Sequence, residues 1–118
     1  MRYKLLGKSG LRVSELCLGA MTFGEDWGWG GSQDEARRVF EAYVEAGGNF
    51  VDTANVYTGG ESERIVGRLL KEGGKRDQVV LATKFGHQNA DMGYGHAAGA
   101  KGGRGYIRRA GEHSLRRL

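Results

Sequence analysis

Short apolar runs alternate three times with segments of helical period in this chain of 118 residues. Each run has the length of a strand, and hydrophobic residues then recur every three or four positions. The expected strands are 16–21, 49–52 and 79–85, and the expected helices begin near residues 32, 61 and 106. Because helices join parallel strands, this alternation predicts βαβ units and a parallel sheet. A (β/α)8 barrel and an open doubly wound sheet both contain such units.

Local signals mark where the expected helices begin and end. Ser32 followed by Glu35 is a capping box, in which each side chain bonds to the other residue's backbone N–H. The pairs Gly47–Gly48 and Gly73–Gly74 end the first two helices, since glycine tolerates the left-handed backbone of a helix end. The third helix contains Gly111, which costs about 1 kcal/mol relative to alanine. We therefore expect the end of the third helix to fray.

Glycine is abundant, with 22 residues and no proline. The clusters 24–31 and 86–105 each follow an expected strand and precede an expected helix, so both loops would lie at one end of the sheet. A Gly-x-Gly-x-x-Gly fingerprint is missing from the first strand–helix turn, which argues against a dinucleotide site of the doubly wound type. Ahead of the first strand, residues 2–6 and 11–14 predict a short β-hairpin.

Composition and cysteine content set the broad class of the protein. The chain is 39% hydrophobic and 27% charged, as is typical of a globular domain. Apolar stretches are too short for a membrane span or a signal peptide, so we expect no membrane partner. The single Cys17 fits neither a disulfide framework nor a zinc pattern, and we expect no metal. A reducing, cytoplasmic setting is the corresponding expectation.

The net charge of +4 is unevenly distributed. Residues 101–118 carry six basic groups and one acidic group, which leaves residues 1–100 at −1. A basic terminal helix can bind nucleic acid or an anionic membrane surface, but it can also be a solvated helix face. Aromatic stacking residues and a recognised nucleic-acid motif do not accompany these charges, so we expect no nucleic acid partner.

Three polar residues mark one end of the expected sheet. Asp52 closes the strand 49–52, Tyr57 lies in the loop beyond it, and Lys84 lies near the end of the strand 79–85. A charged group at the end of a buried strand is costly without a partner, and Asp52 and Lys84 have opposite signs. Barrel enzymes place their catalytic groups at the C-terminal ends of strands. We therefore expect the three side chains to converge.

A phenol beside an ammonium group is a usable acid. The pKa of an ordinary tyrosine is about 10, and a neighbouring lysine lowers it by stabilising the phenolate. Such a phenol can protonate a carbonyl oxygen as negative charge develops there. Carbonyl reduction also needs a hydride, which a side chain cannot supply, so a nicotinamide cofactor is implied. The alternative is a buried Asp52–Lys84 ion pair with Tyr57 as an ordinary loop aromatic.

Several segments, in order from residue 2 to Leu118, resemble the aldo/keto reductase family, in the branch of bacterial reductases and potassium-channel β subunits. They are 4–14 (KLLGKSGLRVS), 16–24 (LCLGAMTFG), 50–57 (FVDTANVY), 60–67 (GESERIVG) and 81–85 (LATKF). The resemblance implies an α/β fold, the N-terminal portion of a (β/α)8 TIM barrel with about three β/α units after a hairpin. It also implies an NADPH-dependent oxidoreductase that reduces aldehydes or ketones to alcohols.

The resemblance further assigns roles to individual residues. Tyr57 is similar to the family's proton donor, Lys84 to the lysine that tunes it, and Asp52 to the partner of that lysine. Met21 and Thr22 look like contacts to the nicotinamide end of NADPH, and Asp52 to its ribose. The loop Trp27-Gly28-Trp29 is similar to the loop that lines the substrate site, with a plain surface loop as the alternative.

Part of the family's pattern is missing. The catalytic histidine of the family ends a fourth strand, which would follow Leu118, and a complete barrel needs about 250 residues. His113 falls within the third helix, and His87 and His96 fall in the glycine-rich loop, so none takes that role. We therefore expect residues 1–118 to be part of one barrel domain, inactive by itself and prone to self-association. A non-catalytic nucleotide-binding module similar to channel β subunits and a small basic nucleic-acid-binding protein are the alternatives.

Overall fold

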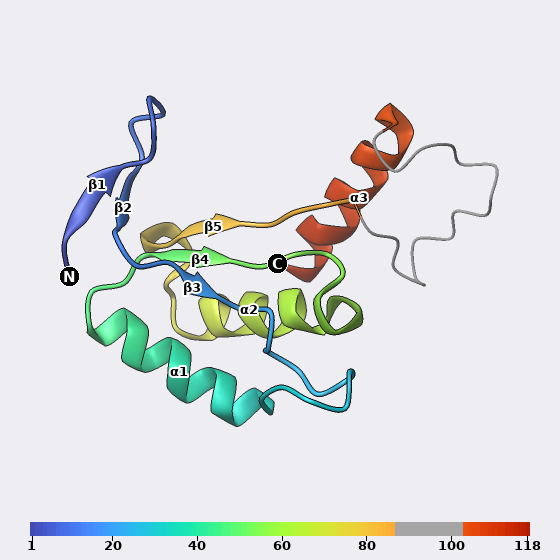
Figure 1. The fold of residues 1–118 in the computed structure, drawn as a ribbon, viewed down its shortest axis with the longest axis horizontal. Helices are drawn as coiled ribbons and strands as arrows, with labels where there is room; N and C mark the ends of the chain where they lie inside the picture. The colour runs from blue at the N-terminus through green and yellow to red at the C-terminus, as the bar shows by residue number, and fades with distance from the viewer. Residues whose placement is uncertain (87–102) are drawn as a thin grey trace.

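The computed structural model describes residues 1–86 and 103–118 (Figure 1). An antiparallel hairpin, β1 and β2, precedes a parallel sheet in the order β3-β4-β5. The strands are β1 Tyr3–Leu5, β2 Arg12–Ser14, β3 Leu18–Gly19, β4 Phe50–Asp52 and β5 Val80–Ala82. The helices are α1 Gln33–Glu45, α2 Glu61–Glu72 and α3 Arg104–Arg117, with short 3-10 turns η1 Tyr57–Gly60 and η2 Arg76–Gln78. The predicted hairpin and parallel βαβ arrangement are thereby confirmed.

Both α1 and α2 cover the same face of the sheet. One hydrophobic cluster joins Ala36 and Phe40 of α1 to Val66 and Leu69 of α2 and to Val51 of β4. Figure 1 shows the two helices side by side beneath the strands. A doubly wound sheet carries helices on both faces, so this one-sided packing is the arrangement of a barrel wall.

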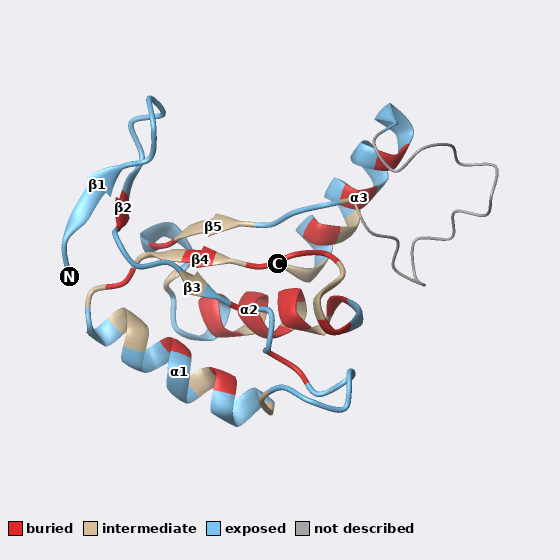
Figure 2. Ribbon diagram, viewed as in Figure 1, coloured by how far each residue is buried: buried red, intermediate tan, exposed pale blue. Residues whose placement is uncertain are grey.

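Side-chain alternation along β4 divides the sheet into two unlike faces. Val51 is fully buried against the helices, whereas Phe50 and Asp52 on the opposite face are only partly buried. In Figure 2 the buried residues concentrate along α2 and the middle of β4, and β5 is of intermediate burial. In a closed barrel the second face would line the interior, which neighbouring strands fill with side chains.

The start and end of α1 follow the predicted signals. Ser32 Oγ accepts a hydrogen bond from Glu35 N at 3.3 Å, and Ser32 N donates to Glu35 Oε2 at 2.8 Å, so the capping box is present. This backbone bond from Ser32 is the largest of the effects that hold the pKa of the Glu35 carboxyl below its ordinary value. Beyond the helix, Gly47 has a φ of 87°, and a Cβ on Gly48 would collide with the ring of Tyr43.

The strands are shorter than the apolar runs that predicted them. The run 79–85 pairs only over Val80–Ala82, all three of intermediate burial, and Phe85 beyond the strand is 50% exposed. The run 16–21 pairs over Leu18–Gly19 and leaves Cys17 exposed. The physical reason is that, within the described residues, β3 and β5 have one neighbour each and the inner face has no covering layer.

Helix α3 packs with its C-terminal end against α2. A Cβ on Gly67 of α2 would collide with the carbonyl oxygen of Arg117, so glycine permits a close approach of the two helices. Gly111 lies within α3, where a Cβ would meet nothing within 4 Å, and the helix continues through it to Arg117 rather than fraying there. Most of the predicted glycine-rich loop, residues 87–102, lies outside the described residues, together with His87 and His96.

Two glycine substitutions should therefore change stability in opposite directions. Gly67→Ala should lower the free energy of unfolding by about 1–3 kcal/mol, because the added methyl group forces α2 and α3 apart. Gly111→Ala should raise it by about 0.5–1 kcal/mol through helix propensity alone. Urea unfolding of dilute protein, followed by tryptophan fluorescence, measures both. Equal effects of the two substitutions would contradict the close approach at Gly67.

Candidate active site

Asp52, Lys84 and Tyr57 lie together at the C-terminal end of the parallel strands. Lys84 Nζ donates to Asp52 Oδ2 at 2.5 Å and to the carbonyl oxygen of Thr53 at 2.9 Å. The same nitrogen lies 4.8 Å from the centroid of the Tyr57 ring. The predicted convergence of the three side chains is therefore present in the structure.

Backbone pairing places Lys84 where its side chain reaches Asp52. Asp52 lies opposite Ala82 in the parallel register, and Lys84 is two residues further along, on the same face. The pairing continues past the two strands, because Thr53 N donates to the carbonyl of Ala82 at 2.9 Å and Asn55 N donates to that of Lys84 at 3.0 Å. The lysine thus lies beyond β5 rather than within it, yet its backbone is held in register.

The Asp52–Lys84 pair is partly exposed, which differs from the alternative of a buried ion pair. The side chains are 35% and 46% exposed. Partial burial lowers the pKa of Lys84, but hydrogen bonds with Asp52 and Tyr57 and their charges outweigh it, so the pKa is raised above its ordinary value. The ammonium group is therefore charged throughout the neutral range.

Tyr57 is presented by a tight turn that the sequence did not reveal. It opens η1, in which Thr58 has the left-handed backbone angles φ 47° and ψ 44°. A non-glycine residue in that region costs on the order of 1–2 kcal/mol. Two hydrogen bonds of the buried Thr58 Oγ1 stabilise it there, one donated to the carbonyl of Phe23 at 2.9 Å and one accepted from Ser62 N at 3.0 Å. The two glycines after Thr58 were the only sequence signal of this turn.

The aromatic loop between β3 and α1 lies beside Tyr57. The rings of Trp27 and Tyr57 are 6.4 Å apart in an edge-on arrangement, and Trp27 and Trp29 are 5.3 Å apart. Both tryptophans are partly exposed, at 39% and 51%. Gly30 has a φ of 117°, and its Cβ would collide with the carbonyl of Gly24, so glycine is required for this loop to fold back.

The remaining predicted site residues follow β3 at the same end of the sheet. Met21 is 43% exposed, and Thr22 is exposed with its backbone carbonyl accepting from Gly31 N at 2.7 Å.

Cys17 directly precedes β3 and is close enough to Asp52 and Lys84 for their charges to act on it. Burial and then Asp52 raise the pKa of its thiol, and Lys84 opposes them. Gly19 pairs with Asp52. Cys17 is two residues before Gly19, so in extended backbone its side chain points to the same face of the sheet as that of Asp52.

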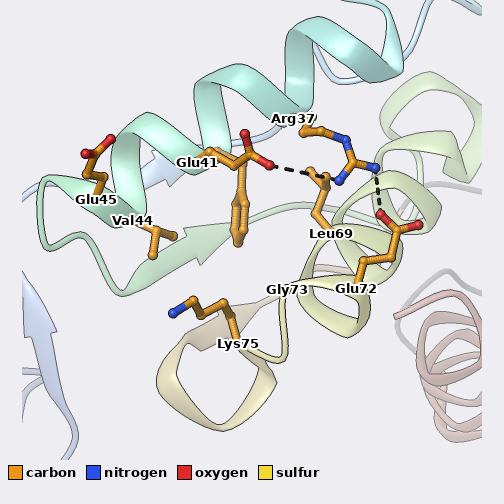
Figure 3. Close-up of a pocket in the computed structure, with 9 residues that line it drawn as sticks. Arg37, Glu41, Val44, Glu45, Leu69, Glu72, Gly73 and Lys75 are labelled. Carbon is orange, nitrogen blue, oxygen red and sulfur yellow. Dashed lines mark hydrogen bonds and ion pairs between the residues drawn. The ribbon is translucent and has the colours of Figure 1, made fainter.

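A separate hollow lies between α1 and α2, on the helix side of the sheet (Figure 3). It has a volume of about 470 Å³, with Phe40, Val44 and Leu69 among its apolar lining residues. An ion pair between Arg37 and Glu72, with an N–O distance of 2.6 Å, joins the two helices at its rim. Because Asp52 and Lys84 lie on the opposite face, this hollow is separate from the candidate active site.

Neither 1–86 nor 103–118 holds a group of three or more histidine, cysteine, aspartate or glutamate residues placed to bind a metal ion. In the same parts of the chain, every helix is too short or too polar to span a bilayer.

Comparison with known proteins identifies the class of this fold and site. Residues 15–118 match the model of the aldo/keto reductase family, so the chain belongs to that family. It is 45% identical over 93 residues to norsolorinic acid reductase of Aspergillus flavus and 46% identical over 80 residues to aryl-alcohol dehydrogenase [NADP(+)] of Phanerodontia chrysosporium. These matches cover 76% and 64% of this chain.

Solved structures agree with the fold. The holo form of an aldo-keto reductase from Bacillus halodurans superimposes with a TM-score of 0.82 and 37% identity over all of this chain. The chain spans 36% of that protein and only 23% and 21% of the two curated relatives. The described fold is therefore part of the (β/α)8 barrel of this family.

Proposed function

We propose that this chain supplies the proton-donating part of an NADPH-dependent reductase that converts aldehydes or ketones to alcohols. The observation that carries the proposal is the contact of one ammonium group, Lys84 Nζ, with Asp52, the Thr53 carbonyl and the ring of Tyr57. An ion pair needs only the first of these contacts. The additional approach of the ammonium to a phenol is what carbonyl protonation requires.

In the proposed reaction the Tyr57 hydroxyl transfers its proton to the substrate's carbonyl oxygen. The Lys84 ammonium stabilises the negative charge that remains on the phenol, and Asp52 and the Thr53 carbonyl orient that ammonium. The chemistry that a nicotinamide cofactor would supply, when bound, is the hydride for the carbonyl carbon. For this proton transfer, the Tyr57 hydroxyl must lie within hydrogen-bond reach of the substrate oxygen that it protonates.

The residues at the C-terminal end of the parallel strands fit such a cofactor. Thr22 is an exposed threonine, Met21 has an exposed apolar side chain, and the side chain of Asp52 is partly exposed. A hydroxyl and a carboxylate are suited to the amide and ribose groups of a nicotinamide nucleotide. We assign Met21, Thr22 and Asp52 to cofactor binding. The preference for NADPH is supported by the relative whose name includes NADP(+).

The substrate class we propose is an aromatic carbonyl compound. Trp27 lies beside Tyr57 and Trp29 beside Trp27, and both leave ring surface exposed. Flat aromatic substrates gain about 0.5–1.5 kcal/mol per ring pair beyond their buried area. The names norsolorinic acid reductase and aryl-alcohol dehydrogenase among the relatives support the same class. A cytoplasmic location stays a prediction from the single cysteine.

We expect the isolated chain to have little or no reductase activity, because it spans about a third of a barrel of this family. An assay of NADPH absorbance with a reactive aryl aldehyde measures this. Turnover of about 1–1000 per second, the range of ordinary enzymes, would contradict the expectation. Tight nucleotide binding without turnover in a completed barrel would instead favour the interaction-module alternative.

Removal of the phenolic hydroxyl should abolish reduction but not cofactor binding. The test uses a chimera in which residues 1–118 replace the matching segment of the Bacillus halodurans enzyme, which they resemble over their whole length. Tyr57→Phe should lower kcat by about 100- to 10,000-fold, as expected for loss of a general acid. NADPH affinity, measured by fluorescence, should be unchanged. Lys84→Met should also lower kcat, and Lys71→Met, at an exposed lysine of α2, is the matched control that should retain turnover.

The open sheet should make the isolated chain self-associate. Within the described residues β3 and β5 are edge strands, and unpaired edges template association. Leu16, Met21 and Phe85 add exposed apolar surface. Size-exclusion chromatography with light scattering should therefore find oligomers or aggregates at micromolar concentration. A clean monomer with a sharp, cooperative thermal transition would show that the chain is a self-sufficient domain.

A further inference from the structure

A buried ion pair lies on the helix side of the sheet, behind the candidate active site. Arg117 Nε of α3 donates to Glu63 Oε2 of α2 at 2.6 Å. The Glu63 side chain is fully buried and that of Arg117 is 6% exposed. The other carboxylate oxygen, Glu63 Oε1, accepts a hydrogen bond from Thr83 Oγ1 at 2.6 Å. One buried carboxylate therefore connects α2, α3 and the segment that follows β5.

Burial of this pair is not explained by stability alone. Taking a carboxylate and a guanidinium out of water costs several kcal/mol per ion, and well-packed apolar residues are often at least as stabilising. What a buried pair does provide is a fixed geometry, since each Glu63 oxygen has its own partner at short distance.

Thr83 is the residue directly before Lys84. In extended backbone successive side chains point to opposite faces, so the Thr83 hydroxyl meets Glu63 in the helix layer while Lys84 meets Asp52 on the inner face. β5 is an edge strand within the described residues, and beyond Ala82 its backbone pairs with the β4 segment through the bond from Asn55 N to the Lys84 carbonyl. The hydrogen bond from Thr83 to Glu63 holds residues 83–84 through a side chain, in addition to this backbone bond.

We propose that Glu63 is a positioning residue: the chain Arg117–Glu63–Thr83 fixes the end of β5 so that Lys84 is held against Asp52 and Tyr57. The importance of Lys84 for catalysis rests on the proposed function, but its position does not. Docking of α3 thereby contributes to the geometry of a site that α3 does not itself carry.

The test is competitive acetylation of the 118-residue chain with trace acetic anhydride at submicromolar concentration, read by mass spectrometry. Each lysine reacts according to its free amine fraction, and exposed Lys71 serves as the internal reference. In the wild type Lys84 should react more slowly than Lys71, because its ammonium is hydrogen-bonded and its pKa is raised. Acetylation requires neither nucleotide nor carbonyl substrate, so the result is independent of whether the chain belongs to an active reductase.

Thr83→Val removes the hydroxyl but keeps the branched shape, and should raise the Lys84-to-Lys71 reactivity ratio by about tenfold, the equivalent of one hydrogen bond to a charged group. Thr83→Ser should restore the wild-type ratio. Glu63→Gln should raise it as well. Glu112→Gln, which breaks an exposed ion pair with Arg108 on α3, is the matched control and should leave it unchanged.

Three results would overturn the proposal. The first is a wild-type ratio already near one. The second is an unchanged ratio in both Thr83→Val and Glu63→Gln. The third is a Thr83→Val chain in which all lysines react alike, which means that Thr83 supports the whole fold rather than the position of Lys84.

Discussion

The burial of Val51 beneath α1 and α2 fixes the register of the parallel sheet, on which the candidate active site depends. This residue has no exposed surface and pairs with Leu18 on one side and Leu81 on the other. A slip of one residue would turn Asp52 into the apolar layer and Val51 toward the barrel interior. Because that exchange would bury a carboxylate among aliphatic side chains, the hydrophobic core itself specifies which face carries the candidate active site.

The order and type of the secondary structure could be predicted from the sequence because they depend on local signals. The capping box at Ser32, the glycines after α1 and the stripe of α2 each act within a few residues. Strand lengths could not be predicted in this way. The run 79–85 is mostly apolar, but how much of it pairs depends on whether a neighbouring strand is present.

The residues of the candidate site could be predicted from the sequence, whereas the residues that hold them in place could not. Asp52 and Lys84 are charged residues at the ends of apolar runs, so the sequence itself shows that they need partners. Glu63 has the appearance of a solvated acid in the first turn of a helix, yet it is fully buried. Its partners lie 20 and 54 residues further along the chain, and the packing of β5 and of α3 beside α2 brings them to it. The left-handed Thr58 was likewise hidden, because its hydroxyl donates to the Phe23 carbonyl and accepts from Ser62 N, and these two bonds stabilise a backbone that threonine seldom adopts.

The described residues hold the geometry of the site without the environment that the proposed chemistry requires. Asp52, Lys84 and Tyr57 are brought together by backbone pairing and by the contacts of η1, all of which are local to these β/α units. The ion pair nevertheless remains more than a third exposed on average, and two unit charges attract each other several-fold less in water than near a protein surface. Covering the inner face with further strands would exclude water and strengthen the hold of Lys84 on the phenolate that proton transfer leaves. Positioning and electrostatic strength are thus separable here: the first comes from the strands and helices present, and the second from closure of the barrel around them.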